Sequence, residues 1–261
     1  MSPEGGGRLR WLAVVLPAGL GLGLLVLAWQ LVATHNPHLL PGVGAIAREL
    51  WDNPGLYLSG LGVTLSEMAV GLGASFGAAF LLAVAMCHVK FVERAVMPIA
   101  VVLNVTPIVA ITPGLAVFFG FGATPKYLVA GIIVFFPLLV NCLIGLRSVD
   151  PQALEVFHSL HASTFEILWR LRLPNSLPFV FAGLRIALPL SIIGAVVAEF
   201  LVSGTSSGLG GLIQSAEGYS NLVVIYASTL VLAALGIALT LAVIACERWL
   251  LSWHPSMEGN R

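Results

Sequence analysis

Charge is what this chain lacks most. Only 9% of its 261 residues are Asp, Glu, Lys or Arg, against about 25% in a typical soluble domain. Acidic and basic residues balance at 12 each, so the net charge does not point to an anionic partner, and no nucleic acid is expected. Hydrophobic residues make up 58% of the chain. We therefore expect an all-α integral membrane protein whose surroundings are a lipid bilayer.

Cysteines and catalytic patterns are also scarce. The three cysteines Cys87, Cys142 and Cys246 lie in apolar stretches without a C-x-x-C spacing, so we expect small buried side chains and no disulfide framework. The histidines have no metal-ligand spacing, and no Ser–His–Asp or Cys–His arrangement has local support. We therefore expect no enzyme activity, no metal site and no cofactor in this chain.

Long apolar runs are abundant. A helix of about 20 apolar residues crosses a bilayer. The first run, Trp11 to Ala33, is too long for the apolar region of a signal peptide, at about 7–15 residues, so we expect it to be retained. Six spans are expected, near 11–33, 64–88, 97–121, 127–147, 179–203 and 223–246.

Two of these runs carry special residues. The third contains Pro98, Pro107 and Pro113, which predict either a broken helix covered by protein or a simple proline kink. The second contains Gly73 and Gly77, a small-xxx-small pair that permits close helix contact.

The positive charges predict an orientation. With the N-terminus in the cytoplasm, ten Lys and Arg residues lie inside, and only Arg48 and Lys126 lie outside. We therefore expect cytoplasmic tails at 1–10 and 251–261 around a six-span domain at 11–250. The external stretch 204–222, rich in Gly and Ser, predicts a flexible hairpin or a short re-entrant piece.

A polar segment, Asp150–Pro178, separates two apolar runs on the predicted cytoplasmic side. Asp150 followed by Pro151 predicts a helix start, and Ser163 to Glu166 has the form of a capping box. We expect helices at 151–160 and 164–172, the second ended by Pro174 and Pro178, with a break near His161–Ala162. From spacing alone, this is either a docking device for a soluble partner or an ordinary amphipathic surface loop.

The spacing in this segment resembles the "EAA" loop of ABC-importer permeases. That loop reads Glu-Ala-Ala, three residues, Gly, nine residues, Ile or Val, one residue, Leu-Pro. The corresponding positions here are Glu155, Val156, Phe157, His161, Leu171, Leu173 and Pro174. His161 replaces the glycine, but histidine visits left-handed backbone geometry more often than most residues, so the break can still form.

Shorter motifs over about residues 38–250 resemble the nitrate, sulfonate and taurine group of these permeases. They are Leu40-Pro41, Thr64-Leu65, Ser176–Pro178, Gly183–Arg185, Ala198–Phe200 and Gly208–Gly210. Within that group, 187–199 is most similar to permeases for thiamine-pyrimidine precursors or riboflavin-like compounds.

The resemblance implies a type I ABC importer permease in the bacterial inner membrane that moves a small organic solute by alternating access. It implies a second permease copy, two ATPase subunits that hold ATP and Mg, and a periplasmic or lipid-anchored binding protein. The absence of a G-x-x-x-x-G-K-[ST] phosphate loop agrees with that division of labour. The residues it assigns to ATPase coupling are Glu155, Phe157, Leu160, His161, Ala162, Ser163, Leu173 and Pro174.

Polar residues inside apolar runs are the candidates for the pathway. Glu199 is expected near the outer end of the fifth span, either as a gate or dimer-interface group or as an acid among headgroups. Asn104, Thr106 and Asn141 predict interhelical hydrogen bonds or a lining of the path. The pathway or gate candidates are Asn104, Thr106, Pro107, Asn141 and Glu199.

Two further charged residues have their own expectations. Glu67 is expected at headgroup level, at the start of the second span. Arg185, at the inner end of the fifth span, either snorkels to the surface or braces the polar segment through Glu155 or Glu166.

Two other functions compete with a permease. An ion-coupled secondary transporter needs acids or cation sites near the bilayer centre, and no acid lies at the centre of an expected span. A non-transporting membrane scaffold does not need the proline-broken third run or the polar Asn104 and Thr106.

Overall fold

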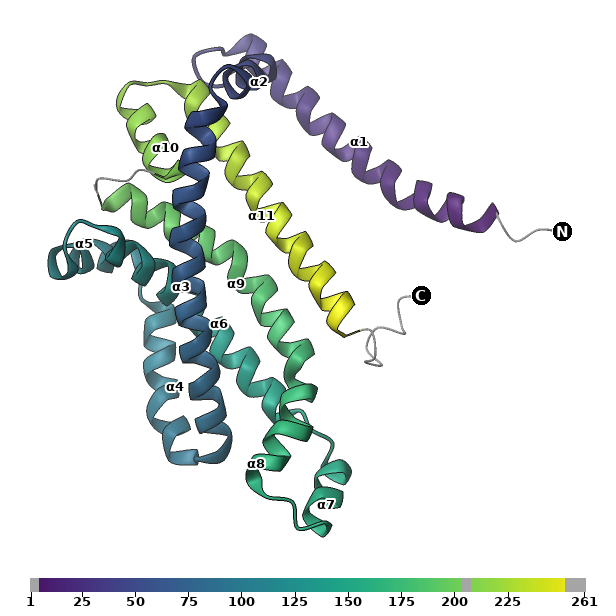
Figure 1. Cartoon of the computed structure of the whole chain (residues 1–261). Coiled ribbons are helices and arrows are strands. Elements are labelled where there is room, and N and C mark those ends of the chain that lie inside the picture. Colours follow the sequence, from purple (N-terminus) through teal and green to yellow (C-terminus); the bar gives the residue numbers. More distant parts are fainter. Residues whose placement is uncertain (1–4, 203–207, 252–261) are drawn as a thin grey trace.

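The computed structural model describes residues 5–202 and 208–251, and over these ranges all regular elements are helices, as the sequence predicts (Figure 1). They are α1 (Gly5–His35), α2 (Val43–Asp52), α3 (Pro54–His88), α4 (Lys90–Val105), α5 (Ile108–Phe119), α6 (Ala123–Arg147), α7 (Pro151–Ser159), α8 (Thr164–Ile167), the π-helical turn η1 (Leu168–Arg172), α9 (Leu173–Leu201), α10 (Leu209–Gly218) and α11 (Leu222–Leu250).

Fewer spans are recognised than the six predicted. In the described part of the chain, four helical segments are long and apolar enough to cross a membrane: α3, α6, the continuous stretch Thr164–Leu201, and α11. The bent pair α4–α5 makes a fifth if it counts as one span. The first predicted span lies in α1, where the apolar part with described side chains, Gly19–His35, is shorter than a span. That helix begins at Gly5, inside the predicted tail 1–10.

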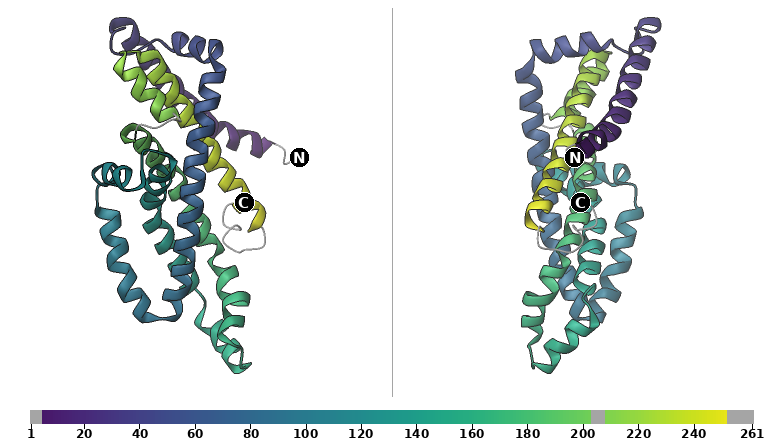
Figure 2. Two further views of the ribbon diagram at one scale, coloured as in Figure 1. Left: turned by 60° about the vertical axis from the view of Figure 1, so that its left-hand side comes forward. Right: turned by 90° about the vertical axis from the view of Figure 1, so that its right-hand side faces the viewer.

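The third predicted span is broken. Between α4 and α5 the chain turns by 102° at Thr106–Pro107, far more than a simple proline kink (Figure 2). Pro107 precedes α5 and has no N–H to lose, and the Thr106 hydroxyl donates to the Val102 carbonyl at 2.7 Å. The third span is therefore broken rather than simply kinked, but Pro107 and most of α5 are exposed in this chain, so the expected cover by protein is not seen here.

The prediction that Pro174 and Pro178 end the second loop helix is wrong. Pro174 is the second residue of α9 and Pro178 lies inside the same helix, so neither proline ends the helical stretch. The π turn η1 precedes this point, so helical backbone continues from α8 through to Leu201. The loop helix is thereby a direct extension of a membrane-spanning helix.

Three helices, α3, α6 and α9, make the core, and Figures 1 and 2 show them side by side. In lipid, the hydrophobic effect does not drive helices together. Small residues therefore favour contacts between helices, because they let the backbones approach closely. A Cβ on Gly71 of α3 would lie 2.6 Å from the Tyr127 carbonyl oxygen of α6. A Cβ on Gly194 of α9 would lie 2.9 Å from the Cα of Ala130, also on α6.

The predicted small-residue pair does not make this contact. A Cβ on Gly73 or on Gly77 would meet nothing within 4 Å in this chain. The contact glycine of α3 is Gly71, two residues earlier and therefore on a different face of the helix.

At the other end of the bundle from α7, the end of α1 packs on α2 and α11. The Trp29 indole N–H donates to the Pro41 carbonyl at 3.0 Å, and the Trp29 ring meets Tyr226 edge-on at 5.2 Å. Beside them, the stretch predicted as a hairpin or re-entrant piece holds the helix α10 in its described part. The described part is therefore a helix and not a flexible hairpin; residues 203–207 lie outside the described residues.

We predict that Gly71→Ala destabilises the protein, because the new methyl group forces α3 away from the α6 backbone. Overpacking of this kind costs about 1–3 kcal/mol. The matched control is Gly73→Ala, which meets open space and should change stability by less than about 0.5 kcal/mol. Thermal melting in detergent measures both, and equal melting midpoints for the two variants would contradict this packing.

Candidate functional site

The segment 150–172, here called the α7–α8 loop, projects from one end of the bundle (Figure 1). Both of its predicted helix starts are confirmed. The Asp150 carboxylate accepts a hydrogen bond from Gln152 N at 2.8 Å, with Pro151 in the first turn. Glu166 N donates to the Ser163 hydroxyl at 3.2 Å, and Ser163 N donates to the Glu166 carboxylate at 3.0 Å, which completes the capping box.

The break between the two helices lies at His161, as predicted. This residue has φ +55°, in the left-handed region. Its N–H donates to the His158 carbonyl at 3.0 Å, and the next N–H, of Ala162, donates to the Phe157 carbonyl at 3.0 Å. This pair of bonds is the Schellman motif, whose left-handed position glycine usually occupies. The histidine therefore adopts the geometry for which a glycine is expected.

Several apolar side chains of the loop are exposed in this chain. Leu160 is 73% exposed and Phe165 is 68% exposed, and Val156 and Trp169 are also exposed. The rings of Phe165 and Trp169 meet edge-on at 6.1 Å. We call these four residues the apolar loop patch. Large exposed apolar groups outside a membrane commonly mark a surface that another molecule covers.

The other predicted coupling residues differ in exposure. Glu155, His161 and Ser163 are exposed. Phe157, Ala162, Leu173 and Pro174 are half-buried, the last two at the start of α9. Exposed and half-buried residues therefore alternate along the loop.

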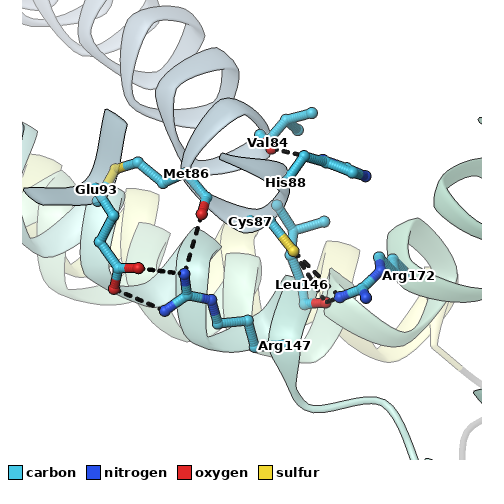
Figure 3. A network of polar contacts seen from close by, with 8 residues as sticks. All are labelled: Val84, Met86, Cys87, His88, Glu93, Leu146, Arg147 and Arg172. Carbon is cyan, nitrogen blue, oxygen red and sulfur yellow. Dashed lines mark hydrogen bonds and ion pairs between the residues drawn. The ribbon is translucent and has the colours of Figure 1, made fainter. Parts of the chain in front are cut away.

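One arginine of this loop fastens it to the bundle (Figure 3). The Arg172 guanidinium, in η1, donates through Nη1 to the Leu146 carbonyl at 2.9 Å and to Cys87 Sγ at 3.1 Å. Leu146 lies in the last turn of α6 and Cys87 in the last turn of α3. One side chain of the loop therefore holds the ends of two core helices.

Arg147 extends the network to α4. It donates to both carboxylate oxygens of Glu93, at 2.8 and 2.6 Å, and to the Met86 carbonyl at 3.0 Å. Three long helices and η1 are thus linked at one point, as Figure 3 shows. In the sequence both arginines contribute only to the positive charge of one side, and the one local signal is a basic residue beside free carbonyls at a helix end.

The pathway candidates are not gathered in one place. Thr106 and Asn141 each bond within their own helix, Asn141 to the Pro137 carbonyl at 2.8 Å, so the prediction of interhelical bonds is wrong for both. Asn104 and Pro107 are exposed on and beside α4. An apolar cavity of about 240 Å³ between α3, α4 and α6 is lined by none of the five candidates.

Glu199 is buried, with 3% of its surface exposed, so within this chain it is not an acid among headgroups. Its Oε1 accepts from the Thr64 hydroxyl at 2.7 Å, and its Oε2 accepts from Gly211 N at 3.0 Å. Thr64 Oγ1 accepts from Leu209 N at 2.9 Å. Side chains of α3 and α9 together therefore cap the first turn of α10.

Glu67 is buried within this chain and is not exposed to lipid headgroups. Its side chain is 1% exposed and lies 3.1 Å from the Nζ of Lys126, which is also 1% exposed. The difference from the sequence expectation comes from the helix start, because α3 begins at Pro54 rather than near residue 64. At about 1.5 Å per residue, Glu67 lies about 20 Å along the helix.

Arg185 does neither of the two things predicted. It pairs with Glu247 and so ties α9 to α11. Among the cysteines, Cys142 is buried as expected, but Cys87 is half-buried beside Arg172 and Cys246 is exposed.

Comparisons with known proteins bear on this arrangement. The family model described as "Binding-protein-dependent transport system inner membrane component" matches residues 69–252, more than half of the chain. The formylaminopyrimidine transport permease protein ThiX of Halalkalibacterium halodurans is 33% identical over 88% of this chain and 93% of its own. The riboflavin transport system permease protein RibX of Chloroflexus aurantiacus is 33% identical over 95% of this chain and 93% of its own.

More distant relatives agree. The taurine transport system permease protein TauC of Escherichia coli is 28% identical, over 96% of each chain. A structure of the MetNI methionine ABC transporter in inward-facing conformations superposes with a TM-score of 0.60 at 18% identity. It covers 80% of this chain and 98% of the other, which supports the fold alone. From the family match and the relatives that cover nearly its whole length, the chain belongs to the inner-membrane permease family of binding-protein-dependent ABC transport systems.

Proposed function

We propose that this chain is the transmembrane permease subunit of an ATP-driven importer that moves a small organic solute across the inner membrane by alternating access. The observation that carries the proposal is the α7–α8 loop. It combines exposed apolar side chains with a covalent continuation into α9 and with the hydrogen bonds of Arg172 to the ends of α3 and α6. A loop that only covered the bundle would need neither the exposed patch nor the ties.

The proposed assembly has two ATPase subunits, which hold ATP and Mg, a second copy of this permease and a substrate-binding protein on the far side. Its orientation follows the positive charges, with both termini and the α7–α8 loop in the cytoplasm. Six spans result if α1 crosses the membrane and if α4 with α5 forms the broken third span. Family membership supports each of these assignments.

The proposed mechanism runs through the loop in three steps. The ATPase subunits grip the apolar loop patch and close together when they bind ATP. Their motion turns α8 and η1, which move α9 directly because the backbone is one continuous helix. Arg172 passes the same motion to the ends of α3 and α6, so the core helices tilt as one body.

The substrate class follows from the relatives. The two at 33% identity carry names for formylaminopyrimidine and riboflavin transport, and a weaker one for taurine transport. We therefore infer a pyrimidine or vitamin precursor, with sulfonates or nitrate-like compounds as the alternative. A thermal-shift screen of the cognate binding protein tests this, since only a true substrate raises its melting temperature in proportion to occupancy.

The ion-coupled alternative has one observation in its favour. Glu67 and Glu199 are buried acids inside membrane helices, of the kind that secondary transporters use. The family of the chain weighs against it, because permeases of this family work with an ATPase subunit.

We predict that Leu160→Asp and Phe165→Asp abolish retention of the ATPase subunits, because each removes an exposed apolar contact and adds a charge. Co-purification from detergent measures the retained ATPase. The control is Gln152→Asp, which places the same charge at an exposed position in the first turn of α7, where the helix dipole accepts it. Stoichiometric ATPase on the two loop variants would show that the subunits dock elsewhere.

Substitution of His161 tests the geometry of the break. His161→Gly should retain the ATPase at least as well as the wild type, since a left-handed non-glycine residue costs about 1–2 kcal/mol. His161→Val should lose it, because a β-branched residue resists φ +55° and the two helices then separate wrongly. If the His161→Val and His161→Gly variants retain equal amounts of ATPase, the break is not needed for docking.

Arg172 separates transmission from docking. We predict that Arg172→Met still retains the ATPase subunits but lowers the transport rate about tenfold or more, since each lost charged hydrogen bond is worth about 1.5–3 kcal/mol. Transport into vesicles and ATPase co-purification are measured on the same preparation. The control is Arg170→Met, an exposed neighbour in η1, which should transport normally. Equal transport by both variants would remove Arg172 from the path of motion.

A further inference from the structure

Two positive charges lie side by side at the start of α4, at the end of the bundle that carries the α7–α8 loop (Figures 1 and 2). Lys90 is the first residue of the helix, Arg94 follows four residues later, and both are exposed. Residues four apart lie on the same side of an α-helix. Neither residue forms an ion pair within the described part of the chain.

The acid nearest to them in the sequence does not neutralise these charges. Glu93 is the only acidic residue of α4, and its two carboxylate oxygens accept bonds from Arg147 at 2.8 and 2.6 Å. The last turns of α3 and α6, which Arg147 joins to α4, contain no acid. Three cations, Lys90, Arg94 and Arg147, against the single acid Glu93 leave this corner of the bundle with two net positive charges.

Beyond the two cations the same side of α4 is apolar. An open hollow of about 730 Å³ runs along it and is lined by Lys90, Glu93, Arg94, Met97, Pro98 and Val101. From Lys90 to Val101 this surface is about 16 Å long, at about 1.5 Å per residue. One leaflet contributes about 15 Å to the hydrocarbon core of a bilayer. The surface therefore has about the length of one leaflet, with its cations at one end.

This order of groups matches the chemistry of an anionic phospholipid. Ammonium and guanidinium groups form charge-assisted hydrogen bonds with phosphate oxygens. Basic residues near a membrane surface attract lipids whose headgroups carry a net negative charge. The apolar side chains farther along the helix offer a surface to an acyl chain, which has no polar group to satisfy.

A second copy of the chain fits this surface less well. Two copies that met here on a two-fold axis would each present the same patch, because such an interface repeats one surface on both subunits. Each copy would bring its own Lys90 and Arg94, so the contact would hold four unbalanced cations. A lipid phosphate adds a negative charge at the same place.

We propose that this side of α4 is a binding site for one anionic phospholipid: Lys90 and Arg94 bind its headgroup phosphate, while Met97, Pro98 and Val101 contact an acyl chain in the hollow. In the orientation proposed above, the lipid belongs to the cytoplasmic leaflet. The site itself requires neither that orientation nor ATP-driven import.

Binding of the lipid has a consequence for the position of α4. Lys90 and Arg94 lie three residues and one residue from Glu93, so without an anion they compete with Arg147 for the Glu93 carboxylate. A bound headgroup engages both cations instead. The lipid therefore stabilises the ion pair between Glu93 and Arg147 that links α4 to the end of α6.

Native mass spectrometry of the purified permease, in the oligomer that it forms in detergent, tests the site. The two probes are phosphatidylglycerol and phosphatidylcholine with the same acyl chains, which differ in the net charge of the headgroup. The wild type should bind phosphatidylglycerol more tightly. The variant Lys90→Gln/Arg94→Gln should bind it about 10- to 30-fold more weakly, since each cation near an anionic lipid surface favours binding about fivefold.

The matched control is Arg170→Gln/Arg248→Gln. It removes the same charge from two exposed positions, on η1 and on α11, that do not line the hollow. This control should keep the preference of the wild type for phosphatidylglycerol.

Three results overturn the proposal. The first is equal binding of the two lipids by the wild type, and the second is a preference that survives Lys90→Gln/Arg94→Gln. The third is a bound lipid on the single chain that is absent from the two-copy species, which would mean that a second copy covers this surface. Because neither import nor an ATPase subunit is measured, each of these results leaves the proposed function standing.

Thermal melting in detergent gives a second measurement. A ligand that binds only the folded chain raises the melting temperature. Phosphatidylglycerol should raise that of the wild type and of the control more than phosphatidylcholine does, and the difference should vanish in Lys90→Gln/Arg94→Gln. The difference should also shrink at high salt, because charges at exposed positions are screened. An equal difference in all three proteins contradicts the site.

Discussion

Backbone groups at helix ends are the constraint on which the rest of this structure depends. Each helix leaves N–H groups free at its start and carbonyl groups free at its end, and in a bilayer there is no water to bond them. The chain has only 24 charged residues, 12 of each sign. Several of them serve these ends: Arg147 bonds the Met86 carbonyl, Arg172 bonds the Leu146 carbonyl, and Glu199 bonds Gly211 N.

In the proposed mechanism, this use of charge lets the α7–α8 loop transmit motion. A loop attached only at its two ends would flex, whereas Arg172 fixes it at a third point, on the last turns of α3 and α6. The same bonds that satisfy the helix ends therefore stiffen the connection between a solvent-exposed patch and the core. Stability and coupling rest here on the same few hydrogen bonds, so a variant that breaks them affects both.

What could be predicted from the sequence was local. The helix starts at Asp150 and Ser163 and the break at His161 depend on residues within four positions of each other, and all three are as predicted. The helical class and the broken third span follow from composition and from prolines, which act on their own turn of helix.

What could not be predicted was the pairing between distant residues. The ion pair of Glu67 with Lys126, the bonds of Arg172 and the close approach at Gly71 each join helices far apart in the chain. An apolar run does not show where its helix begins, and α3 starts about ten residues earlier than its apolar run indicates. The headgroup placement of Glu67 follows from that gap, whereas Gly73 and Gly77 were singled out by their spacing alone.

At both ends of the bundle, charged side chains bond free backbone groups at helix ends, but the charges are of opposite sign. At the α7 end, free carbonyls are bonded by arginine, which does not lose its charge in proteins. At the α10 end, free N–H groups are bonded by side chains of α3 and α9: Leu209 N donates to the Thr64 hydroxyl and Gly211 N to the Glu199 carboxylate. In the proposed mechanism, the arginine bonds stiffen the end of the bundle that receives the motion of the ATPase subunits, whereas the bonds at the other end only hold the first turn of α10 in place.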